Sequence, residues 1–259
     1  MPDDAQPAEG DALRHALTLD RYPRSAAYDP RWVIEHMMGP NVLWLTEALT
    51  EALPLAPGMR VLDLGCGRAL SSIFLAREFG VQVWAADPWI KPSENWTRVR
   101  EAGLEERIFP ISAEAHRLPF AEGFFDAILS MDAYHYFGTD DLYLPYCARF
   151  LKDGGRIGIA VPGIRAEQQR LPPPQLAPYW DADFCSFHSP AWWRRHWEKS
   201  LAVTVEHAGW LPHGWADWLA WNRVCALAGR GSEPERALLE ADGGELLGFS
   251  RVVARRQPA

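Results

Sequence analysis

The chain has 259 residues, of which 48% are hydrophobic and 23% charged. This length fits one large α/β domain or a domain with a small appendage, and the composition excludes wholesale disorder or a fibrous repeat. With 26 basic and 34 acidic residues, the net charge is −8. An anionic chain has no general attraction for nucleic acid or for anionic membranes, so we expect neither as a partner.

The four cysteines form no CxxC pair, which argues against a zinc site and favours a reducing compartment over a disulfide framework. Residues 1–10 are acidic and polar, without the pattern of a secretory signal. No apolar run approaches the roughly 20 residues that span a bilayer. We therefore expect a soluble, cytoplasmic protein.

Residues 1–12 are predicted to form a frayed tail. Apolar residues then recur at helical spacing from Trp32 to Leu53, and Gly39-Pro40 divides this stretch into two helices. After it, strands are predicted at 61–64, 81–86, 108–111, 125–131 and 155–161, the last introduced by a turn at 152–154, with helices at 70–79, 94–102 and 142–151 between them.

The amino-acid composition changes after Pro162. Residues 163–190 are rich in proline and are predicted to be largely irregular. Helices at 191–200 and 214–227 and a closing strand at 247–254 follow. Strands that alternate with helices predict a parallel sheet covered by helices on both faces.

The most informative motif is the run Asp63-Leu64-Gly65-Cys66-Gly67, which joins a predicted strand to a predicted helix. Glycines there let the backbone approach a ligand at the carboxyl edge of the sheet. A dinucleotide site would have glycine where Leu70 stands. The Asp63 carboxylate would also repel a pyrophosphate, so a ligand with a cationic amine and no phosphate fits better.

Residues 57–162 resemble the class I S-adenosylmethionine-dependent methyltransferases. Besides the glycine motif, the chain has an acidic residue, Asp87, at the end of the second strand and the run Ala113-Glu114-Ala115 ahead of Leu118-Pro119-Phe120. Phe125–Ile128 and Leu151–Gly155 match later landmarks of the family. The resemblance implies a Rossmann-like, doubly wound, mostly parallel seven-stranded sheet with S-adenosylmethionine as cofactor.

The resemblance also implies roles for single residues. Asp87 would hold the ribose hydroxyls, Glu114 would accept from the adenine amino group, and the Ala115 amide would face a ring nitrogen. The full set expected around the cofactor is Gly39, Asp63, Gly65, Cys66, Gly67, Asp87, Pro88, Glu114, Ala115 and Ser130.

Three parts of the chain are expected. Residues 1–56 would be a tail and a helical lid over the donor, residues 57–162 the cofactor-binding core, and residues 163–259 a Pro/Trp-rich acceptor cap with closing helices and a strand. At Gly39 the backbone could approach the methionine moiety, or Gly39-Pro40 could simply be a turn between helices.

Catalytic candidates follow strand four, where the fold places the methyl group. His135 is the best candidate for a general base, because its ordinary pKa lies near neutrality, and a purely structural histidine is the alternative. Asp132 and Tyr134 are candidates for the acceptor pocket or for loop caps. Phosphoethanolamine methyltransferases have Asp-Ala-x-x-His here, one residue longer than Asp132-Ala133-Tyr134-His135.

Eight of the 13 tryptophans lie between Trp180 and Trp221. Trp180, Trp192, Trp193 and Trp197, with His188 nearby, are candidates for an aromatic cap that suits an apolar or cationic acceptor. The alternative is that most of these tryptophans fill the core between helices and sheet.

The leading hypothesis is methyl transfer from S-adenosylmethionine to a small-molecule acceptor at N or O. One alternative is a lipid-modifying enzyme like the cyclopropane-fatty-acid synthases, although their characteristic residue set is not evident here. Another is a non-catalytic S-adenosylmethionine-binding module, and the fold alone does not choose among these. The oligomeric state is left open.

Overall fold

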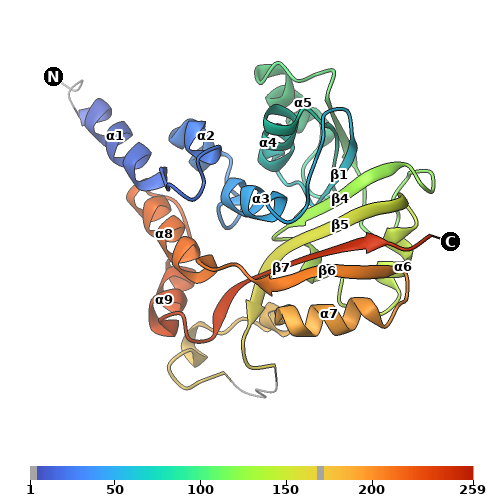
Figure 1. The fold of residues 1–259 in the computed structure, drawn as a ribbon. Coiled ribbons are helices and arrows are strands. Elements are labelled where there is room, and N and C mark those ends of the chain that lie inside the picture. The colour runs from blue at the N-terminus through green and yellow to red at the C-terminus, as the bar shows by residue number, and fades with distance from the viewer. Residues whose placement is uncertain (1–4, 168–171, 259) are drawn as a thin grey trace.

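Five parallel strands form the centre of the protein (Figure 1). The computed structural model describes residues 5–167 and 172–258. The strand order is β3-β2-β1-β4-β5, so the chain adds strands first on one side of β1 and then on the other. This is the doubly wound arrangement expected. The parallel strands are β1 (Arg60–Leu64), β2 (Gln82–Asp87), β3 (Ile108–Ser112), β4 (Phe125–Met131) and β5 (Leu151–Ile164).

Two C-terminal strands complete the sheet of seven. β7 (Leu247–Arg256) runs antiparallel to β5, and β6 (Val203–Trp210) runs antiparallel to β7 at the edge. The predicted fold class, a mostly parallel seven-stranded Rossmann-like sheet, is confirmed. The edge strand β6 was not predicted, although buried and exposed side chains alternate at its start.

Alternation along each strand divides the core between the two faces of the sheet. Val61 packs on the face covered by α3 (Val42–Thr50) and α4 (Leu70–Phe79). Leu62 and Leu64 point to the other face, whose core includes residues of α6 (Tyr143–Ala148) and α7 (Pro190–Glu198). In Figure 1, α7 lies along β6 and β7, which it contacts closely.

Five further helices complete the described part of the chain. They are α1 (Ala5–Leu17), α2 (Pro30–Glu35), α5 (Pro92–Glu101), α8 (Gly214–Leu227) and α9 (Glu233–Asp242), with short 3₁₀ turns at Ser25–Ala27, Tyr134–Tyr136, Ala177–Tyr179 and Ala182–Ser186. Three of these helices, α2, α5 and α8, match helices predicted from the sequence.

The predicted tail is wrong for residues 5–12, which belong to α1, whereas residues 1–4 lie outside the described part. Helix α9 was not predicted. The turn predicted at 152–154 lies inside β5, as a register shift against β4 with Gly154 at φ +74°. Within residues 5–167 and 172–258, no helix is both long and apolar enough to cross a bilayer.

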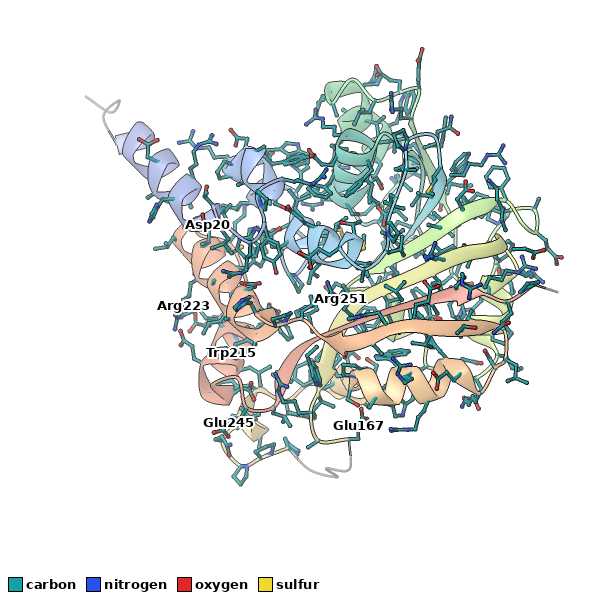
Figure 2. All side chains as sticks on the ribbon, viewed as in Figure 1. Asp20, Glu167, Trp215, Arg223, Glu245 and Arg251 are labelled. Atoms are coloured by element: carbon teal, nitrogen blue, oxygen red, sulfur yellow. The ribbon has the colours of Figure 1, made fainter. Side chains whose placement is uncertain are left out.

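The segment before the sheet is held down by a buried carboxylate. Glu47 of α3 accepts hydrogen bonds from the backbone N–H of Arg24 (3.0 Å) and from the N–H and hydroxyl of Ser25 (2.8 and 2.6 Å). From β7, Arg251 (labelled in Figure 2) donates to the Ala48 carbonyl (2.6 Å) at the end of the same helix. The position of α3 is thus fixed from both ends of the chain.

The contacts of Glu47 lead to a stability prediction. We expect Glu47→Gln to lower the free energy of unfolding by about 1–3 kcal/mol, because an amide presents an N–H₂ group to donors that now meet a carboxylate oxygen. Glu51→Gln is the matched control, since Glu51 is exposed and pairs with Arg251 at 3.0 Å. Glu51→Gln should lower the free energy of unfolding by less than about 1 kcal/mol. Urea unfolding measures both, and equal losses would contradict the anchoring role of Glu47.

Candidate active site

A cavity of about 470 Å³ opens at the carboxyl ends of the parallel strands, where doubly wound sheets bind ligands. Its size lies in the range of small-molecule sites, about 300–1,000 Å³. Its wall comes from the glycine loop after β1, the segment between α2 and α3, the ends of β2 and β4, the segment after β3, and Trp221 of α8. Of the predicted site residues, Gly39, Gly65, Cys66, Gly67, Asp87, Pro88, Glu114, Ala115 and Asp132 line it.

The glycine loop needs its glycines for close packing. Gly65 and Gly67 have φ values of +77° and +52°, which favour glycine. A Cβ atom on Gly65 would lie 2.4 Å from the Cβ of Ala133, and one on Gly67 would lie 2.8 Å from the Met38 sulfur. The loop therefore fits tightly between the β4 loop and the segment that follows α2. Between the two glycines, burial raises the pKa of the Cys66 thiol well above its usual range.

Asp87 holds this loop in place from the end of β2. One carboxylate oxygen accepts from the backbone N–H groups of Trp89 (2.8 Å) and Ile90 (3.0 Å). The other accepts from the Gly67 N–H (2.9 Å). Because a carboxylate has about four acceptor positions, the second oxygen can still accept from a ligand hydroxyl. Trp89 is 74% exposed although it lines the cavity.

After β3, Glu114 and Ala115 form the far wall of the same cavity. The Glu114 carboxylate accepts from the His116 backbone N–H (3.1 Å) and lies 3.0 Å from the Nδ1 atom of that ring. The hydrogen bond from His116 lowers the pKa of Glu114. His116 lines the cavity too, and the sequence analysis did not single it out.

Two expected cofactor residues lie beneath the cavity without lining it. Asp63 points to the α4 face of β1, where its carboxylate accepts from the hydroxyls of Ser71 and Ser72 (2.6 Å each). Burial raises the pKa of Asp63 to about 6. Ser130 donates to the Leu64 carbonyl (2.7 Å) and so ties β4 to β1. Both side chains support the loop from below, so Asp63 does not reach a ligand amine directly.

The expected general base is also turned away from the cavity. His135 is 1% exposed, does not line the cavity and lies against the rings of Tyr136 and Phe187. Burial alone lowers the pKa of His135 to about 3. Tyr134 is fully buried among aromatic rings, and its hydroxyl has no hydrogen-bond partner among the described residues. In this conformation neither side chain can exchange a proton with a molecule in the cavity.

Most tryptophans of the C-terminal part fill the hydrophobic core. The aromatic cap that was expected from them over the acceptor does not form. Trp193 and Trp197 are fully buried. Trp192 stacks between His188 and His196, with ring centroids 3.6 and 4.5 Å away. The tryptophan that reaches the cavity is instead Trp221, whose indole N–H donates to the Gly39 carbonyl (2.8 Å).

Asp132 is the catalytic candidate that the structure brings to the cavity. It follows β4 with φ +51°, a backbone conformation that non-glycine residues rarely adopt and aspartate tolerates better than most. Its carboxylate packs against Gly39 and makes no hydrogen bond to any residue in the described ranges. Burial raises the pKa of Asp132 well above its usual range, and the carboxylate of Glu235 raises it further.

Several wall residues were missed because no local pattern marks them. Met38, Trp89 and Tyr136 are large apolar side chains, 50%, 74% and 56% exposed, that meet at the cavity. Exposed apolar side chains that converge from distant segments indicate a binding surface. Trp89 and Tyr136 stand next to motif residues, which was the only available signal, and nothing in the sequence revealed which face of α8 carries Trp221 inward.

The environment of Asp63 leads to a prediction about pH. Its pKa is about 6 in the folded protein and about 3.9 in an unfolded chain. The folded state therefore binds the proton more tightly, and stability falls as pH rises from about 4 to about 6, by about 3 kcal/mol in total.

Asp63→Asn removes this titration, while its amide oxygen can still accept from both serines. We expect the variant to gain stability relative to the wild type as pH rises through that window and to keep a constant difference above it. Urea unfolding from pH 4 to 8 measures this. A difference independent of pH would show that the Asp63 pKa is not raised.

Comparison with known proteins agrees with this geometry. Residues 61–155 match the family model described as a methyltransferase domain. A methyltransferase named GfsG from Streptomyces halstedii is 37% identical over 117 residues, which cover 45% of this chain and 42% of that protein. A 27-O-demethylrifamycin SV methyltransferase from Amycolatopsis mediterranei is 30% identical over 135 residues, covering 49% of this chain and 50% of that protein.

The chain thus spans about half the length of these curated relatives or less. Among solved structures, the fold is similar to the geranyl diphosphate C-methyltransferase of Streptomyces coelicolor crystallised with S-adenosyl-L-homocysteine. The TM-score is 0.68 at 20% identity, over 98% of this chain and 100% of that chain. Residues 61–155 are therefore a methyltransferase domain of the class I S-adenosylmethionine-dependent type, and the surrounding chain completes the fold of that class.

Proposed function

We propose that this protein transfers a methyl group from S-adenosylmethionine to a small-molecule acceptor, at nitrogen or oxygen. The observation that carries the proposal is one cavity with two unlike carboxyl groups at its two ends. Asp87, at the end of β2, orders the glycine loop and its own turn through three backbone N–H donors and keeps one acceptor position free. Asp132, at the end of β4, has no such commitment and faces the cavity.

The residues present fit the proposed donor. The free acceptor position on Asp87 suits ribose hydroxyls, and the apolar surface of Trp89 suits a flat base. Glu114 and Ala115 would meet the edge of the adenine, while Gly39, Gly65 and Gly67 leave room for the methionine part. When bound, the donor supplies an electrophilic methyl group on a sulfonium.

The chain itself contributes alignment and exclusion of water. The segment between α2 and α3 closes one wall, fixed by the hydrogen bond from Trp221 to Gly39. Holding two reactants in line can lower the barrier by several kcal/mol, on the order of 7–11 in favourable models. A base adds to this only when the acceptor must lose a proton. Asp132 is the group in the cavity suited to that task.

The other functions considered make different demands on this cavity. A non-catalytic binding module would not need an unpaired carboxylate at Asp132 or room beyond the donor. A lipid-modifying enzyme would use the same donor site with an alkene in place of a protic acceptor.

We propose that residues 1–56 act as the lid, 57–162 as the donor-binding core, and 163–259 as the acceptor side, because Gly39 and Trp221 meet at the cavity.

Calorimetry with the donor tests the proposal. We expect S-adenosylmethionine to bind and NAD not to bind, because the loop lacks the dinucleotide spacing. Asp87→Ala should weaken donor binding roughly ten- to a hundredfold, since the charge-assisted hydrogen bond to the ribose, worth about 1.5–3 kcal/mol, is lost.

Asp153→Ala provides the control, because Asp153 is an exposed acid that makes one long ion pair, 3.6 Å from Arg256. It should leave donor affinity unchanged. Tighter binding of NAD than of S-adenosylmethionine would end the methyltransferase proposal. Full donor affinity in folded Asp87→Ala would instead mean that the ribose lies elsewhere.

A further inference from the structure

The end of the cavity beyond β4 is chemically distinct from the end beside β2. Its wall comes from the loop after β4 and from α8: Asp132, Ala133, Tyr136, Phe137 and Trp221. Because the donor residues occupy the β1, β2 and β3 side, this other end is where an acceptor would enter. We refer to these five residues as the acceptor chamber.

The acceptor chamber is aromatic and carries one carboxyl group, that of Asp132. The charge that acts on Asp132 is that of Glu235, a second acid, which accepts a hydrogen bond from Trp218 (2.6 Å). Tyr136 lies at the mouth of the chamber. Its hydroxyl is subject to the electrostatic influence of four carboxylates, those of Asp132, Asp181, Asp183 and Glu235. Burial and these four acids together raise the pKa of Tyr136 to about 12.

Basic side chains of the cavity wall are engaged elsewhere. Arg68 donates to the Glu35 carbonyl at the end of α2 (3.0 Å). The rings of His36 and His116 lie against the Trp32 carbonyl and the Glu114 carboxylate, respectively. An anion in the acceptor chamber would thus meet acids and aromatic rings without a compensating cation.

We propose, on the basis of the methyltransferase function proposed above, that the acceptor is an apolar amine, which this chamber recognises by its ammonium group and apolar body. An ammonium ion can pair with the Asp132 carboxylate and lie against aromatic faces. A carboxylate or phosphate on the acceptor would be repelled by the same groups.

The proposed transfer balances with Asp132 as proton acceptor. The ammonium form binds, and before the attack it transfers one proton to the Asp132 carboxylate, which leaves a neutral amine with its lone pair free. That lone pair forms the new N–C bond while the S–C bond breaks and its electrons return to sulfur, which becomes a neutral thioether. The product is the N-methylated ammonium ion, so the single proton that Asp132 accepted balances the transfer. A carboxyl group in a desolvated site beside a second acid holds such a proton more readily than an exposed one does.

Matched probes test the acceptor class. The protein is saturated with S-adenosylhomocysteine, and binding of 2-phenylethylamine, 2-phenylethanol and 3-phenylpropionate is measured by calorimetry at pH 7.5. These probes share an aromatic body and differ in charge. We expect the amine to bind at least tenfold more tightly than either of the others, and the wild type with S-adenosylmethionine to yield the N-methylated amine by mass.

Two variants separate the chamber from general charge effects. Asp132→Asn keeps the shape and suits the φ of +51°, because asparagine also tolerates this conformation. It should abolish the preference for the amine. Glu105→Gln makes the same change in net charge on an exposed residue ahead of β3, at the opposite edge of the sheet. This control variant should preserve the preference for the amine.

The outcomes distinguish the two proposals. Failure of S-adenosylhomocysteine to bind would overturn the proposed function itself. If it binds, the amine inference is overturned by equal or tighter binding of 3-phenylpropionate or 2-phenylethanol, by binding of none of the three probes, or by an amine preference that survives in Asp132→Asn.

Discussion

The hydrogen bond between the Asp87 carboxylate and the Gly67 N–H (2.9 Å) is the contact on which the rest of the site depends. It joins the end of β2 to the glycine loop after β1, so two neighbouring strands end in one rigid unit. The same carboxylate fixes the turn that exposes Trp89 at the cavity. A buried carboxylate with three backbone N–H donors is stabilised where it stands and needs no rearrangement to receive a ligand.

Segments far apart in the chain complete the cavity around this unit. Trp221 reaches back to Gly39, and Gly39 packs on Asp132, so the N-terminal helices, β4 and α8 meet at one point. The donor side of the cavity is therefore formed mainly by residues of the family's motifs. On the acceptor side, four of the five chamber residues also lie within residues 61–155, and the fifth, Trp221, comes from α8 outside the matched family model. Acceptor choice therefore has to be argued from the side chains of the acceptor chamber.

The sequence predicted the central sheet well because each buried strand is a short apolar run closed by a turn residue. Motif spacing also identified most of the donor wall. It could not predict where a strand residue points: Asp63 belongs to the motif, yet alternation along β1 turns it toward Ser71 and Ser72. The same limit applies to His135, which a 3₁₀ turn carries under Phe187. Residue type suggested His135 as a base, whereas the residue that the structure brings to the cavity is Asp132.

The central claim is that one cavity holds the donor between Asp87 and Asp132. A crystal structure with S-adenosylhomocysteine tests it most directly. The account predicts that the ribose hydroxyls bond to Asp87 and that the sulfur faces the acceptor chamber, with the Asp132 carboxylate on the side that the methyl group would occupy. Density for the ligand outside this cavity, or a sulfur turned away from Asp132 in a closed site, would contradict the account.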